Sequence, residues 1–207
     1  MKIFLVVFTL LFAFSNVPAQ RGELPVFGKE KEQQVSLFDQ QISFFGGATT
    51  VHLSSDLVGA LGALEIGVRQ VNNLPIVRGR VSFPITDGTL DNATLRGEIL
   101  HSNGLVFSRG GSAVKIQSFI IDTTGEGAII TGLASANGSV VGRIPLFDLD
   151  LSGAGIRVRG VTLQITNVGV TLRPEAAGAL NAVFETTAFE AGFPIGTATV
   201  AGLAFGT

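Results

Sequence analysis

"AIITGLASANGSVVGRIPLF", residues 128–147, is the stretch that indicates the fold most directly. Two runs rich in β-forming residues flank the dipeptide Asn137-Gly138. Asn and Gly readily adopt the two positive φ angles that a type I′ turn requires. The stretch therefore predicts a β-hairpin with Asn137-Gly138 at its tip.

Other segments show the alternation of half-buried strands. In "RVSFPI" (80–85), Val81, Phe83 and Ile85 share one face, and "FDLDLS" (147–152) alternates apolar with polar residues. "IRVRGVTLQI" (156–165) alternates with a slip at Gly160, which predicts a bulge there. Together with 27 glycines and 16 phenylalanines, these patterns predict a mainly β protein. We expect a two-sheet β-sandwich-like domain with two short helices.

The two helices are predicted at residues 56–66 and 174–184, where apolar residues recur at helical spacing. Ser55 or Asp56 is placed to cap the first, and Pro174 stands in the first turn of the second. The segments 51–61 and 170–180 also match at a constant offset, and a Phe-Pro-Ile triplet follows each. The offset favours an internal pseudo-two-fold duplication over coincidence.

The N-terminus has the features of a secretory signal. Residues 1–19 combine Lys2, a short apolar run and a small-residue cleavage site, so we expect cleavage before Gln20. Residues 20–34 are polar and predict a flexible leader, and residues 35–207 a single β-rich domain. The last apolar stretch, 191–207, is interrupted by Pro194 and indicates a strand. We therefore expect a secreted, periplasmic or cell-surface protein without a transmembrane segment in its mature chain.

Composition narrows the function classes. The chain has no cysteine, which excludes disulfides and thiolate metal sites. A net charge of −2 with 14% charged residues provides no basic surface for nucleic acid. No nucleophile motif such as G-x-S-x-G is present, so we expect no catalytic residues.

His101 is the first candidate for a ligand contact. The alternation through Ile99 places it on the apolar face at a strand end, whereas His52 faces away from Val51 and Leu53. We expect the His101 ring to be at least partly buried and hydrogen-bonded to nearby backbone or polar groups. A ligand-binding role shared with Ser102 and Asn103 stays open.

Carboxylates offer a weaker candidate site. Asp148 and Asp150 share one strand face at a spacing that a glycosidase pair could use, although both are expected to face water. Asp87 and Asp91 lie in a Gly-containing loop without the dense ligand spacing of a calcium site. We therefore expect no metal centre, and a glycan hydrolase is the least favoured function.

Three segments also carry a family resemblance: "GRVSFPITDGTLDNATLRGEILHSNGL" (79–105), "VTLRPEAAGALNAVF" (170–184) and "AFEAGFPIGTATV" (188–200). Over about residues 48–201 the chain resembles the HtaA-like domains of exported bacterial proteins. The resemblance implies a β-rich extracytoplasmic domain and, as in the best-known members, capture of haem at the cell surface. Those members hold haem iron through a tyrosine assisted by a histidine. This chain has no tyrosine, so only His101 could be the axial ligand.

The sequence thus favours an exported, non-catalytic binding or surface-structural domain without a cofactor. Its partner would be an unknown small molecule or a cell-surface component. The alternative is a haem- or porphyrin-binding protein of the HtaA-like type.

Overall fold

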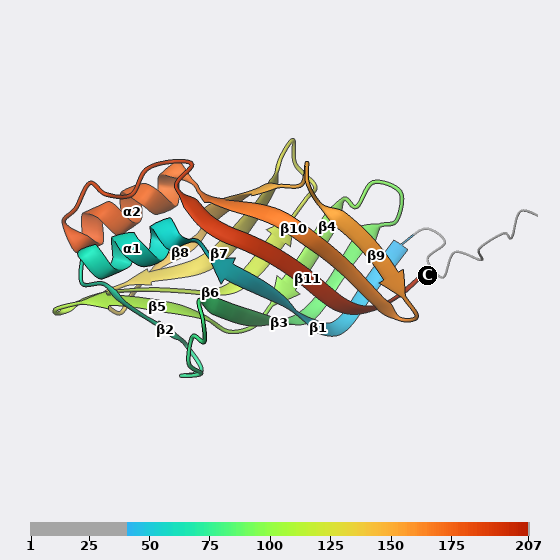
Figure 1. Cartoon of the computed structure of the whole chain (residues 1–207), viewed down its shortest axis with the longest axis horizontal. Coiled ribbons are helices and arrows are strands. Elements are labelled where there is room, and N and C mark those ends of the chain that lie inside the picture. Colours follow the sequence, from blue (N-terminus) through green and yellow to red (C-terminus); the bar gives the residue numbers. More distant parts are fainter. Residues whose placement is uncertain (1–40, 207) are drawn as a thin grey trace, which may run out of the picture. The chain divides into compact units, whose positions relative to one another are not determined.

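The computed structural model describes residues 41–206, which form a β-rich domain with two short helices (Figure 1). The predicted signal peptide (1–19) and leader (20–34) lie outside the described residues. The helices are α1 (Ser55–Ala63) and α2 (Pro174–Phe184). The strands are β1 (Gln41–Leu53), β2 (Gly67–Gln70), β3 (Arg80–Asp91), β4 (Gly97–His101), β5 (Gly104–Arg109), β6 (Ser112–Asp122), β7 (Ala128–Ala136), β8 (Ser139–Asp150), β9 (Gly155–Arg159), β10 (Thr162–Leu172) and β11 (Pro194–Gly206).

Across residues 41–206, eight strands close into a β-barrel in the order β6, β4, β3, β1, β11, β10, β8 and β7. The pairing of β6 with β7 completes the ring, with Val114 opposite Ala136 and Asp122 opposite Ile129. The predicted two-sheet β-sandwich is therefore wrong. Alternation along a strand shows that one face is buried, and both a sandwich and a barrel meet that condition.

Strands outside the ring extend it at both ends. At the end that the helices cover, β5 pairs with β6 and β2 pairs with β5, so the sheet continues there by two strands outside the ring. β9 pairs with the first half of β10, while β8 pairs with its second half. Figure 1 shows α1 and α2 at one end of the barrel and β9 at the other.

The predicted hairpin is confirmed. Ala136 and Ser139 are paired across the turn, and Asn137 and Gly138 have φ angles of 49° and 84°. Both central residues are therefore in the left-handed region that a type I′ turn requires.

Gly138→Val should lower the free energy of unfolding by about 1–3 kcal/mol, because a β-branched residue is strained at positive φ. A Cβ at this position would meet no atom within 4 Å, so backbone strain alone produces the effect. Denaturant unfolding measures it. Gly138→Asn is the control, since asparagine tolerates this region, and an equal loss in both variants would contradict the prediction.

The predicted bulge at Gly160 is instead a turn. Gly160 has a φ angle of 56°, and Arg159 pairs with Thr162 across it, so β9 and β10 form a second hairpin. The change of alternation at Gly160 marks a reversal of the chain.

Both predicted helices are present, although the cap of the first differs from expectation. Ser54 caps α1, because its hydroxyl accepts a hydrogen bond from the Leu57 N–H at 3.0 Å. The same hydroxyl donates to the Pro194 carbonyl at 2.7 Å, which ties the start of α1 to β11. Pro174 begins α2, as predicted.

The two matching segments of the sequence, 51–61 and 170–180, form the end of β1 with α1 and the end of β10 with α2, and no two-fold axis relates them. β1 and β10 both flank β11 and run in the same direction, so α1 and α2 emerge at the same end. From β1 to β10 is a step of two strands around the barrel, whereas a two-fold axis through eight strands needs a step of four. After α2 the next strand, β11, returns beside β10, whereas after α1 the next strand is β2, which pairs with β5, and β3 returns beside β1 only after it.

The Phe-Pro-Ile triplets do not occupy equivalent positions after these two segments. Phe83 lies opposite Thr49, well inside β1, whereas the Phe193 carbonyl accepts a hydrogen bond from the N–H of Leu172 at the end of β10. The predicted pseudo-two-fold duplication is thus corrected: a strand followed by a short helix occurs twice, but no two-fold axis relates the two copies.

The helices close one end of the barrel. Leu57 and Leu61 of α1 and Phe184 of α2 are buried against the strands. The guanidinium of Arg109 in β5 donates to the Phe184 carbonyl and lies 5.9 Å from the centre of its ring. A cation at the C-terminal end of a helix stabilises it. Within residues 41–206, neither helix has the length and apolar run needed to cross a bilayer.

Candidate functional site

His101 lies at the end of β4 and points into the barrel. Its side chain is 5% exposed, and its Nε2 is 2.7 Å from the hydroxyl of Thr49, which is itself 3% exposed. Thr49 comes from β1, so the two polar groups meet inside the barrel although 52 residues separate them in sequence. The prediction that His101 is buried and hydrogen-bonded is confirmed, with a partner that sequence reasoning missed.

A signal for Thr49 was present in the sequence. Thr49 has the same strand parity as Val51 and Leu53, so alternation places all three on the inward face. A threonine on that face needs a hydrogen-bond partner, and an inward histidine on another strand can supply one.

The second nitrogen of the His101 ring is unpaired. Among the described residues, Nδ1 has no hydrogen-bond partner. Burial lowers the pKa of His101 to about 4, and the backbone carbonyls of Phe119 and Ile99 oppose this effect only in part. The ring is therefore neutral at neutral pH, so one nitrogen carries a proton and the other accepts. If Nε2 donates to Thr49, Nδ1 is an acceptor; if Thr49 donates, Nδ1–H is a donor.

Ser102 and Asn103 do not join His101. The N–H of Ser102 donates to the Pro84 carbonyl. The side chain of Asn103 donates to Gln70 at 3.1 Å and accepts from the N–H of Asn72, so it fastens the loop after β2. These two residues shape the turn that follows β4, and their contacts lie apart from the His101 ring.

His101 and Thr49 line a central cavity of about 50 Å³ inside the barrel. The other described residues around it are apolar, and Phe83 and Phe119 pack edge to face with ring centres 4.9 Å apart. The unpaired nitrogen of His101 is thus a lone polar feature in an apolar space.

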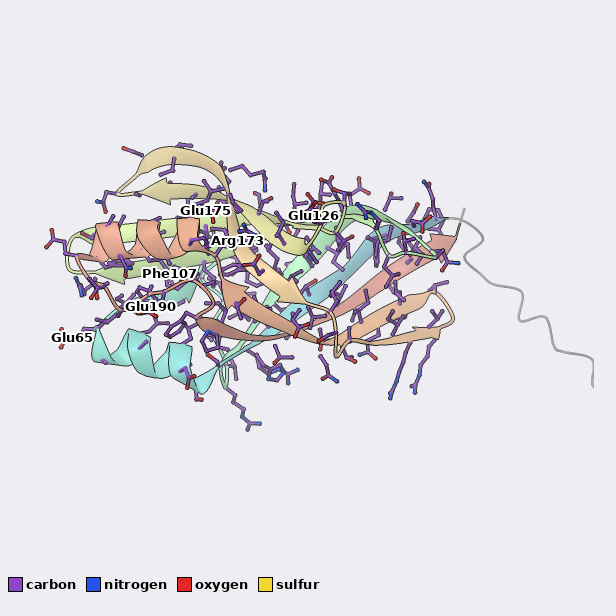
Figure 2. The ribbon with its side chains drawn as sticks, turned by 90° about the horizontal axis from the view of Figure 1, so that it is seen from above. Glu65, Phe107, Glu126, Arg173, Glu175 and Glu190 are labelled. Atoms are coloured by element: carbon purple, nitrogen blue, oxygen red, sulfur yellow. The ribbon has the colours of Figure 1, made fainter. Side chains whose placement is uncertain are left out.

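Two further apolar cavities adjoin the central one. A helix-side cavity of about 70 Å³ lies between the helices and the strands and includes Phe107, which is labelled in Figure 2. A cavity of about 130 Å³ lies at the opposite end of the barrel. Side chains common to neighbouring cavities show that they adjoin: Leu53, Leu105, Phe147 and Ile195 on the helix side, and Ile121 and Ile130 on the other.

The two aspartates of β8 have structural partners. Asp148 forms an ion pair with Arg173 at 2.5 Å, and Arg173 also contacts Glu175 at the start of α2 (Figure 2). Asp150 accepts a hydrogen bond from the N–H of Ser152, and the side chain and backbone of Ser152 together lower the pKa of Asp150. A glycosidase acid requires a raised pKa, so the arrangement does not favour hydrolysis.

The residues present do not fit a haem site. In residues 41–206, no group of three or more histidine, aspartate or glutamate residues is placed to hold a metal ion. His101 is enclosed beside a cavity far smaller than a porphyrin needs, and His52 is on the outer surface. Pockets for drug-sized ligands are roughly 300–1,000 Å³.

The arrangement of a closed barrel with two helices over one end has a known structural counterpart. The chain is similar in fold to the C-terminal domain of HtaA from Corynebacterium glutamicum. The superposition has a TM-score of 0.61 at 12% identity and covers 79% of this chain and 99% of that domain. The resemblance noted in the sequence is thereby supported at the level of an HtaA-like fold. No family model matches the chain, and no curated protein matches it in sequence.

Proposed function

We propose that this chain is an exported, non-catalytic binding protein that holds an apolar small molecule inside its barrel. The observation that carries the proposal is the unpaired Nδ1 of His101, buried in the lining of an apolar cavity. Leaving a buried polar atom unpaired costs about 1–3 kcal/mol, and a ligand that supplies the missing hydrogen bond recovers that cost. The HtaA-like fold and the predicted signal peptide support a role outside the cytoplasm.

Binding of N-phenyl-1-naphthylamine, a neutral dye that fluoresces in apolar surroundings, tests this function. The wild-type protein should bind the dye, whose N–H can pair with His101. His101→Leu should weaken binding by up to about tenfold, which corresponds to the loss of one hydrogen bond. His52→Leu, on the outer surface, is the matched control and should bind as the wild type does. Absence of binding to the wild type would contradict the proposal.

Haem is the second candidate, and only the resemblance of the sequence to HtaA-like domains suggests it. Hemin titration separates it from the first, because ligation of the iron produces a Soret shift. If the wild type shows a Soret shift, and His101→Leu abolishes it while keeping the thermal stability of the wild type, haem and not an apolar small molecule is the ligand. We expect no such shift, because the barrel around His101 would have to open for a porphyrin to enter.

A further inference from the structure

The barrel end away from the helices has an apolar inner face that solvent reaches. Ile156 and Val158 of β9 pair with Ile165 and Leu163 of β10, and residues paired across strands point to the same face. Leu163 and Ile165 are buried inside the barrel, yet Ile156 and Val158 are 50% and 47% exposed. These inward-facing side chains are exposed because β9 has no strand on its other edge among the described residues.

The largest of the three cavities lies directly behind this edge. Ile156 lines it together with Leu151, which precedes β9 and is 41% exposed. We call the region of Leu151, Ile156 and Val158 the β9 mouth. Ile121 and Ile130 separate this cavity from the central one that contains His101. Between the β9 mouth and His101 there thus lie one mostly aliphatic cavity and the side chains of Ile121 and Ile130.

The other end of the barrel is covered. α1 and α2 lie across it (Figure 1). Leu57, Leu61 and Phe184 are buried there, and the contact of Arg109 with Phe184 joins α2 to β5. Entry there would require displacement of a packed helix, whereas entry at the β9 mouth breaks no strand pairing.

We propose that the β9 mouth is the entrance for a ligand with a single linear hydrocarbon chain and a neutral hydrogen-bonding group such as a hydroxyl. The hydrocarbon chain of the ligand extends through the adjoining cavities, and its neutral group forms a hydrogen bond with Nδ1 of His101. This inference rests on the proposed function, because it specifies the ligand and the route of the same site.

The shape and charge of the lining select this ligand class. Three small adjoining cavities suit a slender flexible chain better than a large rigid ring system such as a porphyrin or a sterol. Among the described residues that line them, none is Asp, Glu, Lys or Arg. A charged head group beside His101 would be buried without a counter-ion, which is strongly unfavourable. A neutral group makes the hydrogen bond without that cost.

Displacement of the bound dye tests the ligand class. Dodecanol should displace N-phenyl-1-naphthylamine from the wild type, and dodecane should do so more weakly, because it lacks the hydroxyl. His101→Leu should remove the difference between the two. Equal potency of dodecanol and dodecane on the wild type would overturn the contact with His101. Displacement by cholesterol or hemin as efficient as by dodecanol would overturn the linear class.

Stopped-flow fluorescence tests the entrance. Ile156→Asp should slow association of the dye at least tenfold, because the apolar ligand must pass a hydrated carboxylate. Val161→Asp is the matched control: Val161 is a valine in the turn of the same hairpin, 56% exposed, and outside the cavity lining. Its association rate should equal that of the wild type. Both side chains are at least half exposed, so neither substitution is expected to unfold the domain.

A second measurement uses the absence of cysteine from the chain. Ile156→Cys introduces a unique thiol at the β9 mouth, and dodecanol should slow its modification by a maleimide. Val161→Cys should react at the same rate with and without dodecanol. If the wild type binds neither dye nor dodecanol, the proposed function fails. If it binds both but Ile156→Asp associates at the wild-type rate and dodecanol does not protect the Ile156→Cys thiol, binding stands and the entrance is wrong.

Discussion

Gly47→Ala should lower the free energy of unfolding by about 3 kcal/mol or more. Gly47 lies in β1 opposite Gly202 of β11, with a φ angle of 104°. A Cβ at this position would lie 2.2 Å from the Ala201 carbonyl oxygen and 2.8 Å from the Gly202 Cα. Both are backbone atoms, so the clash can be relieved only by separating two paired strands of the barrel.

Gly46→Ala provides a matched control one residue away. A Cβ there would meet only the Leu203 side chain, at 3.7 Å, which is ordinary van der Waals contact. Denaturant unfolding of both variants should show a small change for Gly46→Ala and a large one for Gly47→Ala. Similar losses for the two would indicate that the tight approach of β1 to β11 does not limit stability.

The second large effect is a dependence of stability on pH that arises at His101. Its pKa is about 4 in the folded protein, because the ring is buried, and 6.5 is its ordinary value. As the pH falls below 6.5, the unfolded chain takes up a proton that the folded chain does not. The folded state therefore loses stability between pH 6.5 and about 4, by about 3 kcal/mol in all, since one pKa unit corresponds to about 1.4 kcal/mol.

His101→Gln isolates this contribution, because glutamine can keep the hydrogen bond to Thr49 but does not titrate. Subtraction of its stability–pH curve from that of the wild type removes the effects of the carboxylates. The difference should be level above pH 6.5 and change steadily down to about pH 4. His52→Gln, on the surface, should follow the wild type. A flat difference curve for His101→Gln would show that His101 is not buried in solution.

Much of the local structure could be predicted from the sequence. The Asn137-Gly138 turn, the buried faces of β3 and the two helices depend on turn chemistry and on the periods of side-chain burial. These are properties of neighbouring residues, so they can be read from a short segment. His101 on the inward face follows from the same alternation.

The closure of the barrel could not be predicted in this way. A strand with one apolar face has the same sequence in a sandwich and in a barrel, because the period of two fixes the buried face and not the neighbouring strand. The pairing of β6 with β7, and of β1 with β11 from opposite ends of the described chain, depends on how all strands pack together.

The candidate site also has some features that follow from the local sequence and others that depend on the tertiary structure. The sequence by itself determined that the protein is β-rich, where it turns, and that His101 faces the core. The tertiary structure alone decided that Thr49 is its partner, that Nδ1 is left unpaired, and that Ile156 and Val158 face inward at an open end. The physical reason is that burial of a side chain is a local pattern. The partner of a buried polar group, and the access of solvent to it, depend on residues that only the closed barrel brings together.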